Sequence, residues 1–129
     1  MLDSQLLLAA GFGCVHFTSD HADGLADLLE RGFVVRHVTS PLLSEEDLLR
    51  QVGRALDFPS YYGANWDAAE ECLRDLEWLP ANGYVLVIRG AERLWMAHPK
   101  CAGRMVEVWL ASAEEWAKTK IPFHLVFCW

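Results

Sequence analysis

The sequence predicts an α/β fold, with a small parallel sheet of three strands flanked by helices. One observation behind this prediction is that short segments rich in β-branched and aromatic residues alternate with longer helical patterns. Another is the almost continuously apolar run YVLVI at residues 84–88, which is typical of a strand covered on both faces. A length of 129 residues, 53% of them hydrophobic, also fits a single domain with one core.

Four segments are predicted strands because they are short and bounded by Gly, Pro, Asn or Asp. They are residues 14–17, 33–38, 84–89 and 123–129. The last three are expected to be the central parallel strands, joined by right-handed crossovers. The first is a candidate fourth strand from the N-terminal segment, and a hairpin-like placement of it stays open.

Four helices are predicted between these strands, at residues 22–31, 45–56, 66–76 and 99–118. Ser44 marks the start of the second helix, because the acidic first turn that follows it suits a helix N-terminus. Pro122 separates the last helix from the last strand, since proline cannot continue a helix. The stretch AERLWMAHPKCAGRM at residues 91–105 is interpreted as a solvated loop leading into the last helix.

Composition excludes several classes of function. A net charge of −7 argues against nonspecific binding to nucleic acid or to an anionic membrane. No apolar run approaches the length of a membrane span, and QLLLAAGFG near the start lacks the basic leader of a signal peptide, so we expect a cytoplasmic protein. The four cysteines and five histidines are scattered, which predicts no metal, no cofactor and no disulfide framework.

The negative charge is concentrated in one segment. Between Asp57 and Trp78 there are six acidic residues and a single basic one, Arg74. Asn65 is expected to cap a helix there, with Gly63 supplying conformational freedom just before it. At 100° per residue, one face of this helix is apolar and the opposite face carries a row of carboxylates at successive i, i+4 positions. The apolar face comprises Trp66, Ala69, Cys72, Leu73 and Leu76, and the carboxylate row comprises Asp67, Glu71 and Asp75.

This segment resembles the barstar family of intracellular ribonuclease inhibitors. YYGANWDAAEECL at residues 61–73 is similar to the family pattern Tyr-Tyr-Gly-x-Asn-x-Asp-Ala-x-x-Asp-Cys-Leu, with the spacing kept. The weaker resemblance extends from about Phe33 to the C-terminus, roughly three quarters of the chain. It implies a barstar-like three-layer sandwich over residues 1–129, with residues 1–32 an N-terminal extension packed on it. The matching residues are Tyr61, Tyr62, Gly63, Asn65, Asp67, Ala68, Cys72 and Leu73.

The resemblance also implies a function and a site. It implies a non-enzymatic immunity protein that binds a basic extracellular ribonuclease, barnase-like and guanyl-specific, in a 1:1 complex inside the bacterial cell. The loop and the acidic helix would enter the ribonuclease's active site in place of RNA phosphates, without direct contact with nucleic acid. The partner-binding residues carried over are Tyr61, Gly63, Asn65, Asp67 and Glu71, while Tyr62 could equally be structural.

Three departures from the family pattern concern this site. Glu71 stands where the family has Asp, and the longer side chain moves the charge outward and adds rotamer entropy. Glu70 replaces a tryptophan of barstar. For a further acidic contact on a later helix, Ala111 falls near the expected place, with Glu114 and Glu115 one turn on.

Two alternative functions are kept beside the inhibitor. One is an enzyme that uses a carboxylate pair, against which stand the convex helix face and the lack of a nucleophile with its base. The other is a barstar-like module for a different basic partner, such as another toxin or a nucleic-acid-binding protein. Two residues receive structural interpretations: Cys72 as a thiol on the apolar face, and His124 as a partly buried, hydrogen-bonded histidine.

Overall fold

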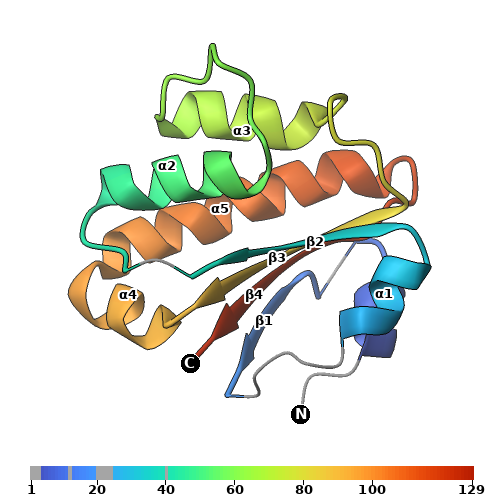
Figure 1. The fold of residues 1–129 in the computed structure, drawn as a ribbon, viewed down its shortest axis with the longest axis horizontal. Coiled ribbons are helices and arrows are strands. Elements are labelled where there is room, and N and C mark those ends of the chain that lie inside the picture. Colours follow the sequence, from blue (N-terminus) through green and yellow to red (C-terminus); the bar gives the residue numbers. More distant parts are fainter. Residues whose placement is uncertain (1–3, 12, 20–24, 40) are drawn as a thin grey trace.

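The computed structural model describes residues 4–11, 13–19, 25–39 and 41–129 (Figure 1). Along the described residues, one or two helices separate each strand from the next, in keeping with the alternation that the sequence predicts. In order they are η1 (Ser4–Leu8), a 3₁₀ helix, β1 (Val15–Thr18), α1 (Ala26–Glu30), β2 (Phe33–Val38), α2 (Glu45–Ala55), α3 (Trp66–Asp75), β3 (Gly83–Arg89), α4 (Ala91–Ala97), α5 (Pro99–Ala117) and β4 (Phe123–Cys128).

The four strands form one parallel sheet in the order β1-β4-β3-β2. The predicted α/β class is therefore confirmed, and the N-terminal segment does supply a fourth strand. The hairpin-like placement of that strand is wrong, because β1 pairs in parallel with β4 from the far end of the chain. The chain then crosses from β1 at one edge of the sheet to β2 at the other.

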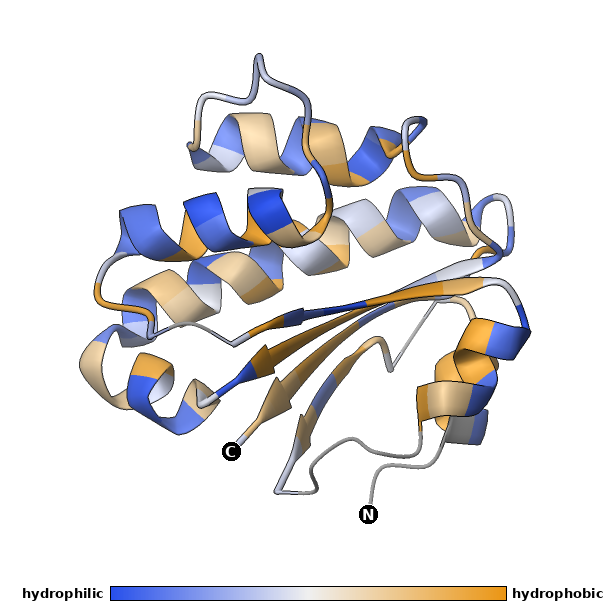
Figure 2. Ribbon diagram, viewed as in Figure 1, coloured by the Kyte–Doolittle hydropathy of each residue, from blue (hydrophilic) through white to orange (hydrophobic). Residues whose placement is uncertain are grey.

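The core lies on both faces of the sheet, because β3 and β4 are buried almost throughout (Figure 2). Successive side chains of a strand point to opposite faces. Leu86 accordingly packs with the helical layer of α2 to α5, whereas Val85 packs with Leu7 of η1 and Leu28 of α1. Figure 1 shows these two short N-terminal elements on the other side of the sheet from α2 and α5. Full burial of a leucine such as Leu7 or Leu28 contributes roughly 2 kcal/mol.

Two helices differ from their predicted extent. The first helix, expected at residues 22–31, is observed at Ala26–Glu30, and residues 22–24 lie outside the described residues. The solvated loop expected at residues 91–98 is wrong, since Ala91–Ala97 forms α4 with Ala91 and Leu94 buried. Gly90, in the left-handed region at φ 67°, makes the turn from β3 into this helix.

The predicted start of α2 is confirmed. The Ser44 hydroxyl oxygen accepts a hydrogen bond from the backbone N–H of Asp47 at 3.1 Å. The Asp47 carboxylate in turn accepts from the backbone N–H of Leu43 at 3.2 Å. These two bonds satisfy donors that a helix start and the turn before it leave unpaired. Within the described residues, no helix combines the length and the apolar composition that crossing a bilayer would require.

A pair of histidines ties the N-terminal segment to the sheet. His124 of β4 is fully buried, with its Nε2 2.7 Å from the carbonyl oxygen of Ala9 and its Nδ1 2.9 Å from Nε2 of His16. A carbonyl only accepts, so Nε2 of His124 carries the proton and its Nδ1 accepts from His16. The hydrogen-bonded histidine predicted from the sequence is confirmed, in a fully buried setting. Burial lowers the pKa of His124 to about 4, against the opposing effect of the Ala9 bond and with a further lowering by His16.

This pair predicts a loss of stability in mild acid. Both histidines have a lowered pKa in the folded state, so the unfolded chain binds protons that the folded chain does not. The free energy of unfolding should therefore fall as the pH drops from 6.5 towards about 4, with His124 contributing roughly 3 kcal/mol at most. Urea unfolding at a series of pH values measures this slope. His124→Gln should flatten the slope, whereas His98→Gln, outside the pair, should keep it; equal slopes in the wild type and His124→Gln would contradict the assignment.

Candidate functional site

The predicted carboxylate row lies on the outer face of α3. Asp67, Glu71 and Asp75 are all exposed, while Cys72 and Leu73 on the opposite face are buried. Figure 1 shows α3 lying outside α2 and α5, farther from the sheet than either. None of the three carboxylates forms an ion pair with the described part of the chain. The row is therefore a concentration of negative charge that the chain itself does not neutralise.

Both ends of α3 are fixed. The side-chain oxygen of Asn65 accepts from the backbone N–H of Ala68 at 2.8 Å, which confirms Asn65 as the predicted N-cap. At the other end Leu76 takes a left-handed conformation with φ 48° while its side chain is buried, and its N–H bonds the carbonyl of Cys72. A left-handed leucine is strained, so the burial of its side chain must offset that strain. Asp67 consequently sits in a defined first turn, where the helix dipole favours its charge.

Two tryptophans attach α3 to its neighbours. The indole N–H of Trp116 on α5 donates to the backbone carbonyl of Leu73 at 2.7 Å. The indole N–H of Trp66 donates to the carboxylate of Glu45 at the start of α2, also at 2.7 Å. Helix α3 is thus held from both sides while its carboxylate row faces outward.

The two tyrosines of the YYG loop have different roles. The Tyr62 hydroxyl donates to the backbone carbonyl of Leu49 at 2.9 Å, and its ring packs edge-on against Phe58 with centroids 4.8 Å apart. Gly53 on α2 makes this possible, since a Cβ there would lie only 2.7 Å from the Tyr62 ring. Burial, and then the Cys72 thiol, raise the pKa of Tyr62 well above its usual value. Tyr62 is therefore the structural anchor of the loop.

Tyr61 projects outward from the anchored loop. Its side chain is 72% exposed, a value that only Met96 and Leu43 exceed among the exposed large hydrophobic side chains of the described residues. Partial desolvation raises the pKa of its hydroxyl, and the charges on Asp75 and Glu71 raise it further. Both of these carboxylates belong to the acidic row, so the row acts electrostatically on the Tyr61 hydroxyl. The structure thus brings an exposed aromatic ring and the carboxylates of α3 onto one surface.

The conformational role expected for Gly63 is wrong. Gly63 does not adopt a positive φ, and the left-handed residue in this loop is Ala64 at φ 51°. A Cβ at position 63 would lie 3.2 Å from the side-chain nitrogen of Asn65, which is a tight but adjustable contact. Gly63 is exposed next to the row, so its close approach to a partner stays a prediction.

Several residues of this surface were missed or left open at the sequence level. Asp75 continues the i, i+4 row and could have been added to the site residues from that spacing alone. Gly53 and Tyr62 support the loop through a contact between separate elements, which no local pattern reveals. Glu70 lies beside the row and is 3.6 Å from Arg74.

The later helix does not extend the row. Glu114 lines a groove beside Cys14, near β1, and Glu115 is paired with Lys118 at 3.1 Å. Ala111 carries no charge, so none of the three positions weighed from the sequence adds an unpaired carboxylate next to α3. The acidic surface is therefore built by α3 and the loop before it.

No catalytic constellation accompanies these residues in the described part of the chain. Cys72 is buried, and its pKa is raised by that burial and then by Glu71 and Asp75, which keeps it a thiol. No group of three or more His, Cys, Asp or Glu side chains among the described residues could hold a metal ion.

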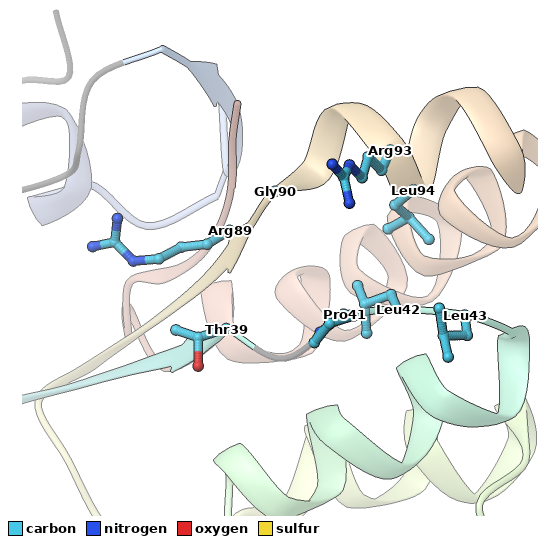
Figure 3. Close-up of a pocket in the computed structure, with 8 residues that line it drawn as sticks. All are labelled: Thr39, Pro41, Leu42, Leu43, Arg89, Gly90, Arg93 and Leu94. Atoms are coloured by element: carbon cyan, nitrogen blue, oxygen red, sulfur yellow. The ribbon is translucent and has the colours of Figure 1, made fainter.

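A cavity of about 270 Å³ lies where β2 and β3 end, at the start of α4 (Figure 3). Figure 3 shows the Arg89 side chain extending away from Leu42 and Leu43, and its Nε donates to His37 at 3.3 Å. The residues that line this cavity include Thr39 but no carboxylate, cysteine or histidine to serve as a base or nucleophile. It gives no support to the enzyme alternative.

The comparisons with known proteins agree with the geometry of α3 and its loop. The family model described as Barstar (barnase inhibitor) matches residues 32–128. The match includes β2, β3, β4 and all of α2 to α5, and it begins after η1, β1 and α1. Comparison with curated proteins gave no match.

The different roles of the two tyrosines can be measured. Tyr62→Phe removes the hydroxyl that bonds the Leu49 carbonyl and should lower the free energy of unfolding by about 1 kcal/mol. Tyr61→Phe removes the corresponding oxygen from an exposed ring and should change the free energy of unfolding by less than about 0.5 kcal/mol. Urea unfolding of the two variants makes the comparison. If both substitutions changed the free energy of unfolding equally, the role of Tyr62 as the anchor of the loop would be contradicted.

Proposed function

Because the chain belongs to the barstar (barnase inhibitor) family, we propose that it is a stoichiometric inhibitor of a basic, secreted microbial ribonuclease of the guanyl-specific, barnase-like type. Membership in an inhibitor family supports a non-enzymatic, ribonuclease-binding role in general. The observation that carries the finer proposal is the exposed carboxylate row of α3, which has no ion-pair partner among the described residues and lies beside Tyr61.

The inhibitor blocks the ribonuclease by occupying the places of the RNA phosphates. A ribonuclease cleft must carry cationic side chains around the scissile phosphate, and carboxylates can pair with arginines there in a bidentate way. Asp67 and Glu71, one helical turn apart, would meet these cations. Tyr61 would contribute aromatic contact, and Gly63 would allow the backbone to come close. Asn65 shapes the helix entry through its cap.

The rigidity of the site favours binding. Association loses free energy when loops and side chains must be ordered, so groups already fixed in the free protein bind at a lower cost. Here the Asn65 cap, the Tyr62 anchor and the Trp116 bond already hold α3 and its loop. The side chains that still have rotamer freedom to lose are those of the carboxylate row and the exposed Tyr61.

Charge also favours encounter and gives the interaction a biological setting. The chain carries a net charge of −7, so a basic ribonuclease would be attracted over distances up to a Debye length, about 10 Å at 0.1 M salt. An inhibitor retained in the cytoplasm would protect the producing bacterium from its own ribonuclease, as an immunity protein. The complex would contain one ribonuclease for each α3 surface.

A second candidate is a different basic partner, such as another toxin or a nucleic-acid-binding protein. Two residues at the site, Glu71 and Glu70, favour a basic partner other than barnase. Glu71 reaches farther than the aspartate of the family pattern, and Glu70 adds a carboxylate where barstar has a tryptophan. A cleft matched to these side chains would place its cations farther from the α3 backbone.

We expect charge removal from the row to weaken inhibition selectively. Glu71→Gln and Asp67→Asn each remove one charge at nearly constant shape, and each should raise the inhibition constant more than about tenfold. Glu92→Gln is the matched control, because it removes one charge from an exposed position on α4. The measurement is inhibition of a panel of secreted guanyl-specific ribonucleases by the purified proteins at about 50 and 500 mM salt.

The outcomes separate the candidates. Stoichiometric inhibition that weakens with salt and with the α3 variants, and not with Glu92→Gln, would support the ribonuclease inhibitor. Inhibition lost equally in all three variants would contradict a role for the row. If no ribonuclease of the panel is inhibited, a pull-down that depends on Glu71 would identify the alternative basic partner.

A further inference from the structure

Strand β1 leaves one edge of the sheet open. It pairs with β4 on one side, and no other strand of the described residues pairs with it on the other. The carbonyls of Cys14 and Thr18 accept from Leu125 and Trp129, so they point at β4. Backbone groups alternate between the two sides of a strand, and the N–H and C=O of Val15 and Phe17 therefore point at the open edge. Unpaired groups of this kind are a template for another strand.

The residues of the open edge include none of the charged side chains or prolines that commonly prevent pairing. The seven residues 13–19 contain no Lys, Arg, Asp, Glu or Pro. The ring of Phe17 is instead 57% exposed, and it lies between Trp95, Phe127 and Trp129 with centroids 5.2 to 6.0 Å away. A large aromatic side chain thus projects from the strand whose backbone is also unpaired.

An apolar groove lies at the other end of the same strand. It has a volume of about 400 Å³, and it is formed where Gly13 and Cys14 meet Leu110, Ala113 and Glu114 of α5. Leu110 is 46% exposed in it. Phe17 projects on the α5 side of the sheet, as does this groove, because Phe17 and Phe127 occupy the same face. The edge therefore carries an aromatic protrusion at one end and an apolar hollow at the other.

We propose that two copies of the chain dimerise by antiparallel pairing of their β1 edges around a two-fold axis at His16. In this register Val15 lies opposite Phe17 of the partner subunit, and both residues exchange their outward backbone hydrogen bonds. The axis is perpendicular to the sheet, so α5 stays on the same side in both copies. The protruding Phe17 of each copy then meets the groove beside Cys14 and Leu110 in the other. A two-fold interface must be self-complementary, and this edge meets that requirement.

Charge identifies a second copy as the occupant. Two chains of net charge −7 repel each other, and the uncharged residues 13–19 form a strip where copies can approach with little repulsion. The basic partner proposed for α3 finds no acidic side chain within residues 13–19, and Glu114 is the one carboxylate among the residues that line the neighbouring groove. The α3 surface lies on the outside of the helical layer and stays free in the dimer (Figure 1). The inference therefore does not rest on ribonuclease inhibition.

Sedimentation equilibrium of the full chain tests the dimer. The small interface predicts a dissociation constant on the order of 10 μM, so the mass should rise with concentration towards twice 14.6 kDa and stop there. Phe17→Glu and Leu110→Glu alter the protrusion and the groove separately, and each should return the mass to that of one chain. Leu29→Glu is the matched control, because Leu29 is also 57% exposed but lies on α1. It should keep the dimer.

Three results would overturn the proposal. One is a wild-type mass that stays at that of one chain up to about 100 μM. Another is dissociation by Leu29→Glu to the same degree as by Phe17→Glu. The third is a mass that grows beyond the dimer, which would indicate an open, non-closing contact. Urea unfolding of each variant verifies that it is folded, and inhibition by Phe17→Glu should equal that of the wild type.

Discussion

The burial of β3 and β4 on both faces is the constraint on which the rest of the structure depends. All six residues of β4 and six of the seven in β3 are buried, so neither face of these strands can be left to solvent. Helices α2 to α5, within the family match, cover one face. Residues Leu7, Leu25 and Leu28 cover the other, and they precede the matched region. The N-terminal segment thus completes the core as well as extending the sheet.

Packing and capping also explain how α3 can carry a row of carboxylates that repel one another. Like charges at i, i+4 destabilise a helix by a few tenths of a kcal/mol for each pair. The Asn65 cap contributes about 1 kcal/mol, and the buried Leu73 and Leu76 roughly 2 kcal/mol each. The stabilising contributions exceed the repulsion several-fold. Packing therefore fixes the helix, and the exposed face is free to be selected for binding.

Local patterns predicted the parts of the molecule that local forces determine. The apolar run of β3, the Ser44 and Asn65 caps and the carboxylate row follow from periodicity and capping, and the structure has each of them. Helix α4 was not predicted, because its short sequence mixes polar and apolar residues without a clear helical pattern. Its helical conformation depends on the packing of Ala91 and Leu94 at the end of the sheet. The pairing of β1 with β4 brings together strands from the two ends of the chain. The packing of the Tyr62 ring against Gly53 attaches a loop to α2. Contacts of this kind join segments that are far apart in the sequence, so they produce no regular residue spacing from which they could be predicted.

The departures from the family pattern affect only the surface of the α3 site. Glu70 and Glu71 project from a helix whose cap, anchor and packing involve other residues, so changing them would leave the scaffold intact. Arg74 lies 3.6 Å from Glu70, and both are partly exposed, so this ion pair is weak. A cationic partner could therefore recruit Glu70 by displacing Arg74 at little cost, whereas Glu71 has no such competitor in the described chain. Specificity within this fold can thus change through two side chains on an unchanged scaffold, because the forces that position α3 are separate from the charges that it presents.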